Sequence, residues 1–97
     1  TSLHPERAHL FQNYPNPFNP STIIRYSVEP LKSGRVETLH LKVFDLTGRE
    51  IADLVNSPTP PGEYSVTWKP GAISSGIYFY RLTYGSFVEL KKMIFVK

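Results

Sequence analysis

Apolar and polar residues alternate along most of this sequence, and no window repeats its apolar residues at the 3.6-residue spacing of an α-helix. Val, Ile, Thr, Tyr and Phe gather in runs of about five to nine residues, which Gly, Pro and Asn separate. Such runs are typical of half-buried β-strands, whose side chains point alternately to the two faces of a sheet. The sequence therefore predicts an all-β fold.

The number and spacing of these runs favour an immunoglobulin-like antiparallel β-sandwich of about seven strands. The clearest runs are 22–28, 39–46, 64–68, 76–82 and 87–96. An open barrel is the alternative. The cysteine pair that marks antibody domains is absent, so the sandwich prediction rests on strand count, spacing and one central Trp.

Alternation along these runs also predicts which side chains form the core. Trp68 is the only tryptophan, and its indole ring is large enough to fill the space between two sheets, so we place it at the centre. The predicted core residues are Tyr26, Leu41, Val43, Tyr64, Val66, Trp68, Tyr80 and Leu82.

The last run, 87–96, carries apolar residues on both of its faces. Val88 and Leu90 share one face of a regular strand, and Met93 and Phe95 share the other. One extra residue in the strand would bring both pairs to the same side, so we predict a β-bulge near residues 91–92.

Three prolines lie within six residues just before the first clear strand. Pro15 and Pro17 lack a backbone N–H, so an extended segment carrying them can pair on one side only, as an edge strand does. Tyr14 and Phe18 are aromatic residues that need burial, which favours this edge strand over the alternative of a flexible proline-rich linker.

Polar or proline-rich segments connect the other runs. Residues 29–37 form a solvated loop, and Gly48 allows a turn after Thr47. A short strand then covers 49–55, with Ile51 and Leu54 as anchors, while the three prolines of 56–62 exclude that segment from the centre of a sheet.

Composition limits the organisation of the chain. Its 97 residues, 40% of them apolar and 20% charged, have room for one core, and the absence of cysteine excludes disulfides. The formal charge of +3 is mild and dispersed, so it does not indicate nucleic-acid binding. No apolar run approaches the roughly 20 residues of a transmembrane helix. We assign 1–10 to a polar leader or linker and 11–97 to one domain, expected to be a monomeric module of a longer chain without membrane insertion.

Four sequence blocks, in order, resemble the C-terminal sorting domain of type IX secretion substrates. The blocks are 13–22 (NYPNPFNPST), 43–49 (VFDLTGR), 76–82 (GIYFYRL) and 91–93 (KKM). That family overlaps in sequence with the immunoglobulin-like domain of flagellar hook-capping proteins. Connector 29–38 is longer than the usual hairpin of the family, and 56–61 is richer in proline, so specificity carried by these loops is expected to differ.

The resemblance implies a non-catalytic signal without a cofactor. Its partners would be an upstream cargo domain in the same chain, the outer-membrane secretion machinery and a surface protease. The cargo would cross the periplasm of a Bacteroidetes-type bacterium and reach the cell surface or the medium. Family motifs carry over onto Pro15, Asn16, Pro17, Gly76, Tyr78, Lys91 and Lys92, and the terminal strand, which ends at Lys97, is the best candidate for recognition.

These motif residues also have purely structural explanations. Pro15 and Pro17 can protect a sheet edge, and Gly76 can allow a tight start to a strand in which Tyr78 is buried. Lys91 and Lys92 are adjacent, so in a regular strand one of them points inward and only the other can contact a partner.

Other functions find less support in the sequence. Asp45 precedes a turn, where a hydrogen bond from its carboxylate to the backbone explains it better than catalysis does. His4, His9 and His40 are too scattered for a metal site. A structural spacer or hook-capping-type domain is the second hypothesis. A carbohydrate-binding module is the third, resting on the aromatic residues Phe44, Phe79 and Phe87, which we expect on outward faces.

Overall fold

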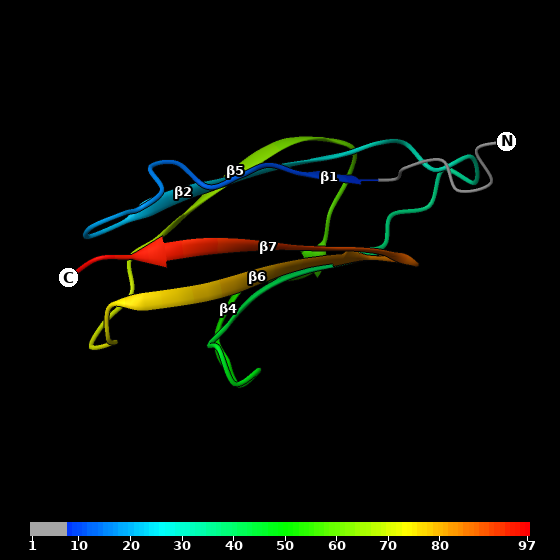
Figure 1. Cartoon of the computed structure of the whole chain (residues 1–97). Helices are drawn as coiled ribbons and strands as arrows, with labels where there is room; N and C mark the ends of the chain where they lie inside the picture. Colours follow the sequence, from blue (N-terminus) through cyan, green and yellow to red (C-terminus); the bar gives the residue numbers. More distant parts are fainter. Residues whose placement is uncertain (1–7) are drawn as a thin grey trace, which may run out of the picture.

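Two antiparallel sheets face each other in the computed structural model, which describes residues 8–97 (Figure 1). One sheet has the order β1-β2-β5, and the other has the order β4-β3-β6-β7. The strands are β1 (Ala8–Leu10), β2 (Thr22–Val28), β3 (Thr38–Phe44), β4 (Glu50–Pro58), β5 (Gly62–Trp68), β6 (Gly76–Tyr84) and β7 (Phe87–Phe95). The predicted all-β immunoglobulin-like sandwich is thus confirmed. His4 and most of the expected leader lie outside the described residues.

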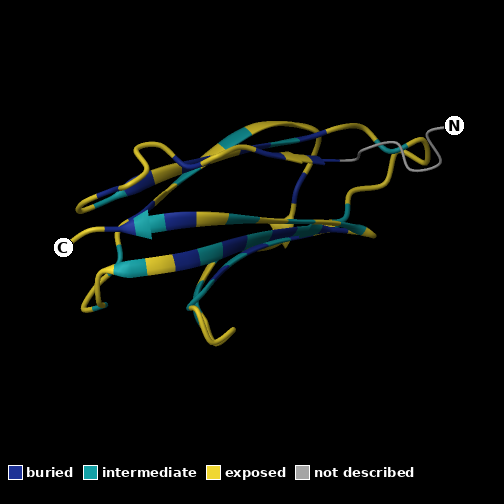
Figure 2. Ribbon diagram, in the orientation of Figure 1, coloured by how far each residue is buried: buried dark blue, intermediate teal, exposed yellow. Residues whose placement is uncertain are grey.

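The inner faces of the two sheets form one core, visible as the buried positions of Figure 2. Along β2 and β3 the predicted alternation holds, because every second side chain is buried. Of the predicted core residues, Tyr26, Leu41, Val43, Trp68, Tyr80 and Leu82 are buried. Tyr64 and Val66 are only partly buried, since β5 is the outermost strand of its sheet. No helix among residues 8–97 is long and apolar enough to span a membrane.

Trp68 is buried as expected, but it lies at one end of the core and not at its centre. It is the last residue of β5, and its indole ring lies 5.8 Å from the ring of Phe18 and 6.3 Å from that of Tyr78. Phe18 comes from the proline-rich segment, so that segment completes the core at this end.

Strand β7 is regular, so the predicted bulge near Lys91 and Lys92 is wrong. Its residues pair one to one with β6 from Tyr84↔Phe87 to Gly76↔Phe95. Odd-numbered residues face the core, which makes Phe87 an inward residue and corrects its expected outward position. Val88 and Leu90 are 59% and 56% exposed on the outer face, a position that alternation alone could not assign.

The irregular pairing occurs instead between β3 and β4. Register shifts lie between Leu41 and Lys42 and between Val43 and Phe44. Strand β4 also continues to Pro58, beyond the predicted end at Val55. This extension is compatible with proline because β4 is an edge strand.

The proline-rich segment is a loop, not the predicted edge strand. Only two isolated bridges tie it to the sheets, Tyr14↔Ile23 and Phe18↔Phe95. Because Pro15 and Pro17 have no N–H to donate, a continuous ladder cannot form through them. Phe18 is buried as expected, but Tyr14 is 75% exposed. The first strand, β1, instead falls in the last residues of the expected leader, a run too short to show alternation.

Candidate functional site

One end of the sandwich gathers the segments that the sequence singled out. The loop from β1 to β2, the start of β6 and the end of β7 meet there, beside the C-terminus marked in Figure 1. Ala8, in contrast, pairs with Val28, the last residue of β2, at the opposite end of the sandwich. We call this region the C-terminal end and define it by residues 13–18, 74–78 and 93–97.

The proline-rich loop follows the edge of β7 near its end. The N–H of Phe18 donates to the carbonyl of Ile94 at 3.0 Å, and the N–H of Val96 donates to the carbonyl of Phe18 at 3.1 Å. The side-chain Oδ1 of Asn16 accepts the N–H of Ile94 at 2.9 Å. Asn16 thus replaces the backbone carbonyl that a neighbouring strand would supply, while exposed Pro15 and Pro17 flank it at the surface.

A buried polar network fixes the shape of this loop. Asn13 Nδ2 donates to Thr22 Oγ1 at 3.0 Å and to the Pro15 carbonyl at 3.1 Å, and the Thr22 hydroxyl donates to the same carbonyl at 2.9 Å. Asn13 and Thr22 are 2% and 1% exposed, yet neither was in the predicted site. Their residue types were the available signal, because Asn and Thr beside a turn often bond to nearby backbone groups.

Tyr80 links the loop to the core. Its hydroxyl accepts the N–H of Asn13 at 2.8 Å and donates to the carbonyl of Phe11 at 2.8 Å. Burial of the phenol, aided by the carboxylate of Glu89 and opposed by the hydrogen bond from Asn13, raises the pKa of Tyr80 to about 12. The hydroxyl therefore stays neutral at ordinary pH and can both donate and accept.

The start of β6 holds the other side of the C-terminal tail. Gly76 pairs with Phe95 at a φ of 155°, a backbone conformation that side chains rarely adopt. The N–H of Lys97 donates to Ser75 Oγ at 2.8 Å. Tyr78 is buried, and its hydroxyl donates to the carbonyl of Ser74 at 2.7 Å. Both structural explanations offered for Gly76 and Tyr78 therefore agree with their surroundings.

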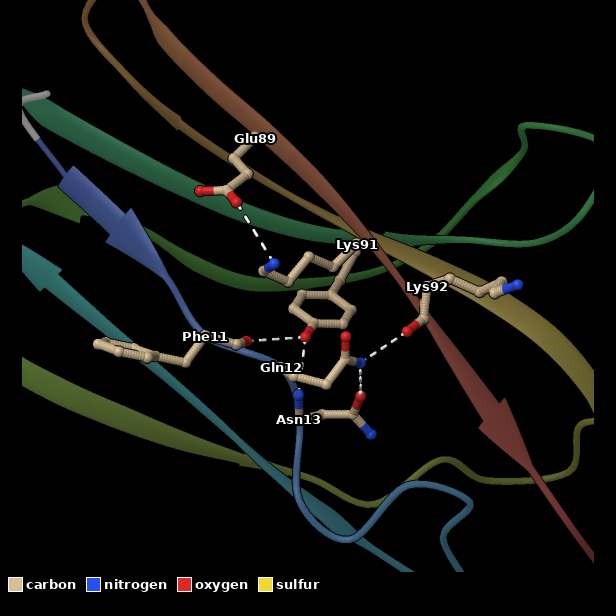
Figure 3. Close-up of polar contacts among 7 residues, drawn as sticks. Phe11, Gln12, Asn13, Glu89, Lys91 and Lys92 are labelled. Carbon is tan, nitrogen blue, oxygen red and sulfur yellow. Dashed lines mark hydrogen bonds and ion pairs between the residues drawn. The ribbon is translucent and has the colours of Figure 1, made fainter.

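The two lysines of the fourth block lie farther along β7 and point to opposite faces. Lys91 faces inward, where its Nζ lies 3.4 Å from Glu89 Oε2 (Figure 3). Lys92 is exposed, and its carbonyl accepts the side-chain N–H of Gln12 at 2.8 Å. Lys92 is therefore the more accessible of the two charges.

A hollow lies beside the C-terminal end and shares Ser74 and Tyr78 with it. Asp45 lines this hollow, and its Oδ1 accepts bonds from the hydroxyl and N–H of Thr47 and from the N–H of Arg49. The Thr47 hydroxyl, followed by the Arg49 amide, lowers the pKa of Asp45. The predicted turn at Thr47 and Gly48 is confirmed, with Gly48 at a φ of 89°. The carboxylate of Asp45 is thus occupied in holding the turn.

The outer face of the four-stranded sheet bears on the carbohydrate-binding hypothesis. Phe44 and Phe79 lie on this face, next to each other across β3 and β6. The guanidinium carbon of Arg81 lies 4.6 Å from the ring centroid of Phe44, so the arginine covers the surface on which a sugar would stack. This arrangement argues against sugar binding there.

The structure thus brings together most of the predicted recognition residues. Those at the C-terminal end are Pro15, Asn16, Pro17, Gly76, Tyr78 and Lys97, whereas Lys91 and Lys92 lie outside it. Among residues 8–97, no group of three or more His, Cys, Asp and Glu side chains could hold a metal ion.

Comparisons with known proteins bear on the family and the fold of the chain. The model of a family described as "Secretion system C-terminal sorting domain" matches residues 12–97. None of the curated proteins matches the sequence. The crystal structure of dimeric latent PorU from Porphyromonas gingivalis is similar in fold, with a TM-score of 0.71 and 23% identity. The match covers 97% of this chain and 10% of that one.

Proposed function

Because this chain belongs to the secretion system C-terminal sorting domain family, we propose that it directs a larger cargo protein through the outer-membrane translocon of the type IX system. A sorting signal of this kind is not a catalyst, and it implies export to the cell surface or the extracellular space. We propose further that the cargo passes through the periplasm and that a surface protease acts after translocation.

The C-terminal end is the surface that we propose the translocon recognises. The observation that supports it is that two family blocks bond to the terminal segment 94–97: Asn16 bonds to Ile94 and Gly76 pairs with Phe95, while Lys97 bonds to Ser75, the residue before Gly76. Recognition of this end requires a folded domain, because the residues come from positions far apart in the sequence. An unfolded chain would not present them together.

A reporter fusion tests the proposal. The domain is joined after a periplasmic reporter in a host that has the type IX machinery, and the reporter is measured in periplasm, surface and medium. We expect the reporter to leave the periplasm in this host and to remain there in a matched strain without the translocon. Retention of the fusion in the periplasm of the competent host, with the domain folded, would contradict the proposal.

Asn16→Ala is the variant that tests the proposed surface. It removes the acceptor for the Ile94 N–H at an exposed position, so we expect a stability loss of only about 1 kcal/mol. Export should nevertheless fall, because the loop and the terminal strand are no longer joined at that point. Asn19→Ala is the matched control, since Asn19 is exposed and forms none of the hydrogen bonds found between residues 8 and 97.

A further inference from the structure

The free edge of β7 is covered along only part of its length. Lys92 accepts a bond from Gln12, and Ile94 and Val96 bond to the proline-rich loop, so even-numbered residues direct their backbone groups away from β6. Val88 and Leu90 share this orientation. No hydrogen bond among the described residues joins their amides or carbonyls to the loop. Among residues 8–97, therefore, only the Gln12 side chain bonds to this edge between Val88 and Lys92, and we call that stretch the open edge.

The other edges are less suited to adding a strand. Strand β1 has three residues, and β4 carries a proline and lies against two register shifts. The outward side chains of β5 are polar, namely Glu63, Ser65 and Thr67. On β7 the open stretch is instead regular and flanked by the exposed apolar side chains of Val88 and Leu90.

The residues along the open edge complement themselves in an antiparallel arrangement. If Leu90 faces Leu90 of a second copy, Glu89 faces Lys91 of that copy, and Lys91 faces its Glu89. Facing pairs of this kind have their side chains in contact, so opposite charges stabilise the register and like charges oppose it. We propose that two copies of this domain associate through their β7 edges, centred on Leu90, which joins their four-stranded sheets into one continuous sheet.

Backbone geometry fits the same register. Leu90 would exchange two hydrogen bonds with its counterpart, and Val88 would exchange two with Lys92 on each side, about six bonds in all. The Lys92 carbonyl already accepts Gln12 Nε2 at 2.8 Å, but a carbonyl oxygen has a second lone pair. The proline-rich loop stops the pairing at Lys92 and so limits the register.

Glu89 and Lys91, on the inner side of β7, limit which strands can pair with the open edge. Glu89 and Lys91 bond to each other at 3.4 Å and are 33% and 27% exposed, so they border the edge without being buried. Inward-pointing charges on an edge strand oppose pairing with an apolar or like-charged strand. In the proposed register, a second copy places its Lys91 opposite Glu89 and its Glu89 opposite Lys91. The sequence alone favoured a monomer because this pairing depends on which face each residue takes.

We expect the association to be weak. The paired stretch is short, and interfaces that bury less than about 1,000 Å² are transient, so a dissociation constant of about 10⁻⁵ to 10⁻⁴ M is expected. The proposal does not depend on the sorting function, because it concerns the isolated domain.

Two charge variants test the pairing by sedimentation equilibrium of the full chain from about 10 μM to about 1 mM, a range that brackets the expected constant. In Glu89→Lys, both inner residues are Lys, and in Lys91→Glu both are Glu. Each variant alone should associate at least about tenfold more weakly than the wild type. A mixture of equal amounts should form a heterodimer at wild-type strength, because every facing pair is again of opposite charge.

The controls separate association from folding. Each variant also loses the ion pair within its own chain, so thermal unfolding must show that it remains folded. The double variant with both charges exchanged should regain both the ion pair and the self-association. A wild-type chain that stays monomeric to about 1 mM, or single variants that associate as the wild type does, would overturn the proposal.

A backbone variant tests the same edge independently. Leu90→Pro removes an N–H that points away from β6, so no bond inside the sheet is lost, whereas Leu90→Thr keeps this N–H. We expect the proline variant to remain monomeric and the threonine variant to dimerise. A dimer that survives Leu90→Pro in a folded domain would show that another surface is used.

Discussion

Asn13, Thr22 and Tyr80 place polar groups next to a core that is otherwise apolar. Each of them bonds to a partner in the β1–β2 loop, so burial leaves none of these groups unsatisfied. The loop thereby gains a defined shape that its own backbone, interrupted by prolines, could not supply.

Tyr80 makes stability depend on alkaline pH. Its pKa in the folded protein is about 12, above the ordinary value of 10.0, so the unfolded state loses its proton first. The stabilisation is complete below pH 10 and disappears as the pH rises toward 12, a loss of about 2 to 3 kcal/mol. Urea unfolding measured from pH 8 to about 12 should show this decline.

Tyr80→Phe is the matched variant for this measurement. It is less stable at neutral pH, because Asn13 and Phe11 lose a partner, but its decline with alkaline pH should be shallower. A residual decline is expected from Tyr26, whose pKa is raised by burial and by Tyr64. Equal slopes for the variant and the wild type would exclude Tyr80 as the group responsible.

Trp68→Ala tests the packing at the C-terminal end. The indole ring contacts Phe18 and Tyr78, so its removal leaves a cavity and should cost about 3 to 5 kcal/mol. Ile23→Ala, at an exposed position on β2, should change stability by less than about 0.5 kcal/mol. A Trp68→Ala loss as small as that control would mean that the end of the core is not formed as described.

At the scale of the element, β7 performs different tasks along its length. Met93 and Phe95 complete the core, while residues 94–96 bond to the proline-rich loop. Val88 and Leu90 keep apolar side chains on the outer face. Apolar residues on both faces therefore reflect two uses of one regular strand, and no bulge is required.

The two lysines of β7 should behave differently when replaced. Lys92→Ala should leave stability within about 0.5 kcal/mol and, under the proposed function, should leave export unchanged, because Lys92 is exposed and lies outside the C-terminal end. Lys91→Ala removes the partner of Glu89 and should cost about 0.5 to 1 kcal/mol. Thermal unfolding and reporter export measure the two effects, and equal melting losses in both variants would assign both lysines to structure.

At the scale of the whole molecule, Ala8 and Lys97 lie at opposite ends of the sandwich. Ala8 pairs with the far end of β2, while Lys97 bonds to Ser75 at the C-terminal end. The first described residue and the surface proposed for recognition therefore lie at opposite ends of the sandwich.

A folded tag placed after Lys97 should block export without unfolding the domain. The tag would cover Asn16 and the prolines beside it, while the core and both sheets stay intact. The same tag joined before Thr1 is the control and should permit export. Normal export with the C-terminal tag, in a host where the untagged fusion is exported, would exclude this end as the recognition surface.

Much of the fold could be predicted because alternation is a local property. The burial of Tyr26, Leu41 and Val43 follows from one pattern of period two, which the sheets preserve. The proline-rich loop could not be assigned in the same way, since its conformation depends on hydrogen bonds that its residues make to Thr22 at the start of β2 and to Tyr80 of β6. The two faces of β7 were equally apolar, so only packing against β6 and the loop distinguished them.

The sequence by itself determined most of the strands, the sandwich and the residue types that mark a sorting domain, because periodicity and motifs are local properties of the chain. Only the tertiary structure decided that Asn16, Gly76 and Lys97 meet at one end, and that Val88 to Lys92 form an open edge. The physical reason is that hydrogen bonds between distant segments fix which backbone groups are occupied and which remain available.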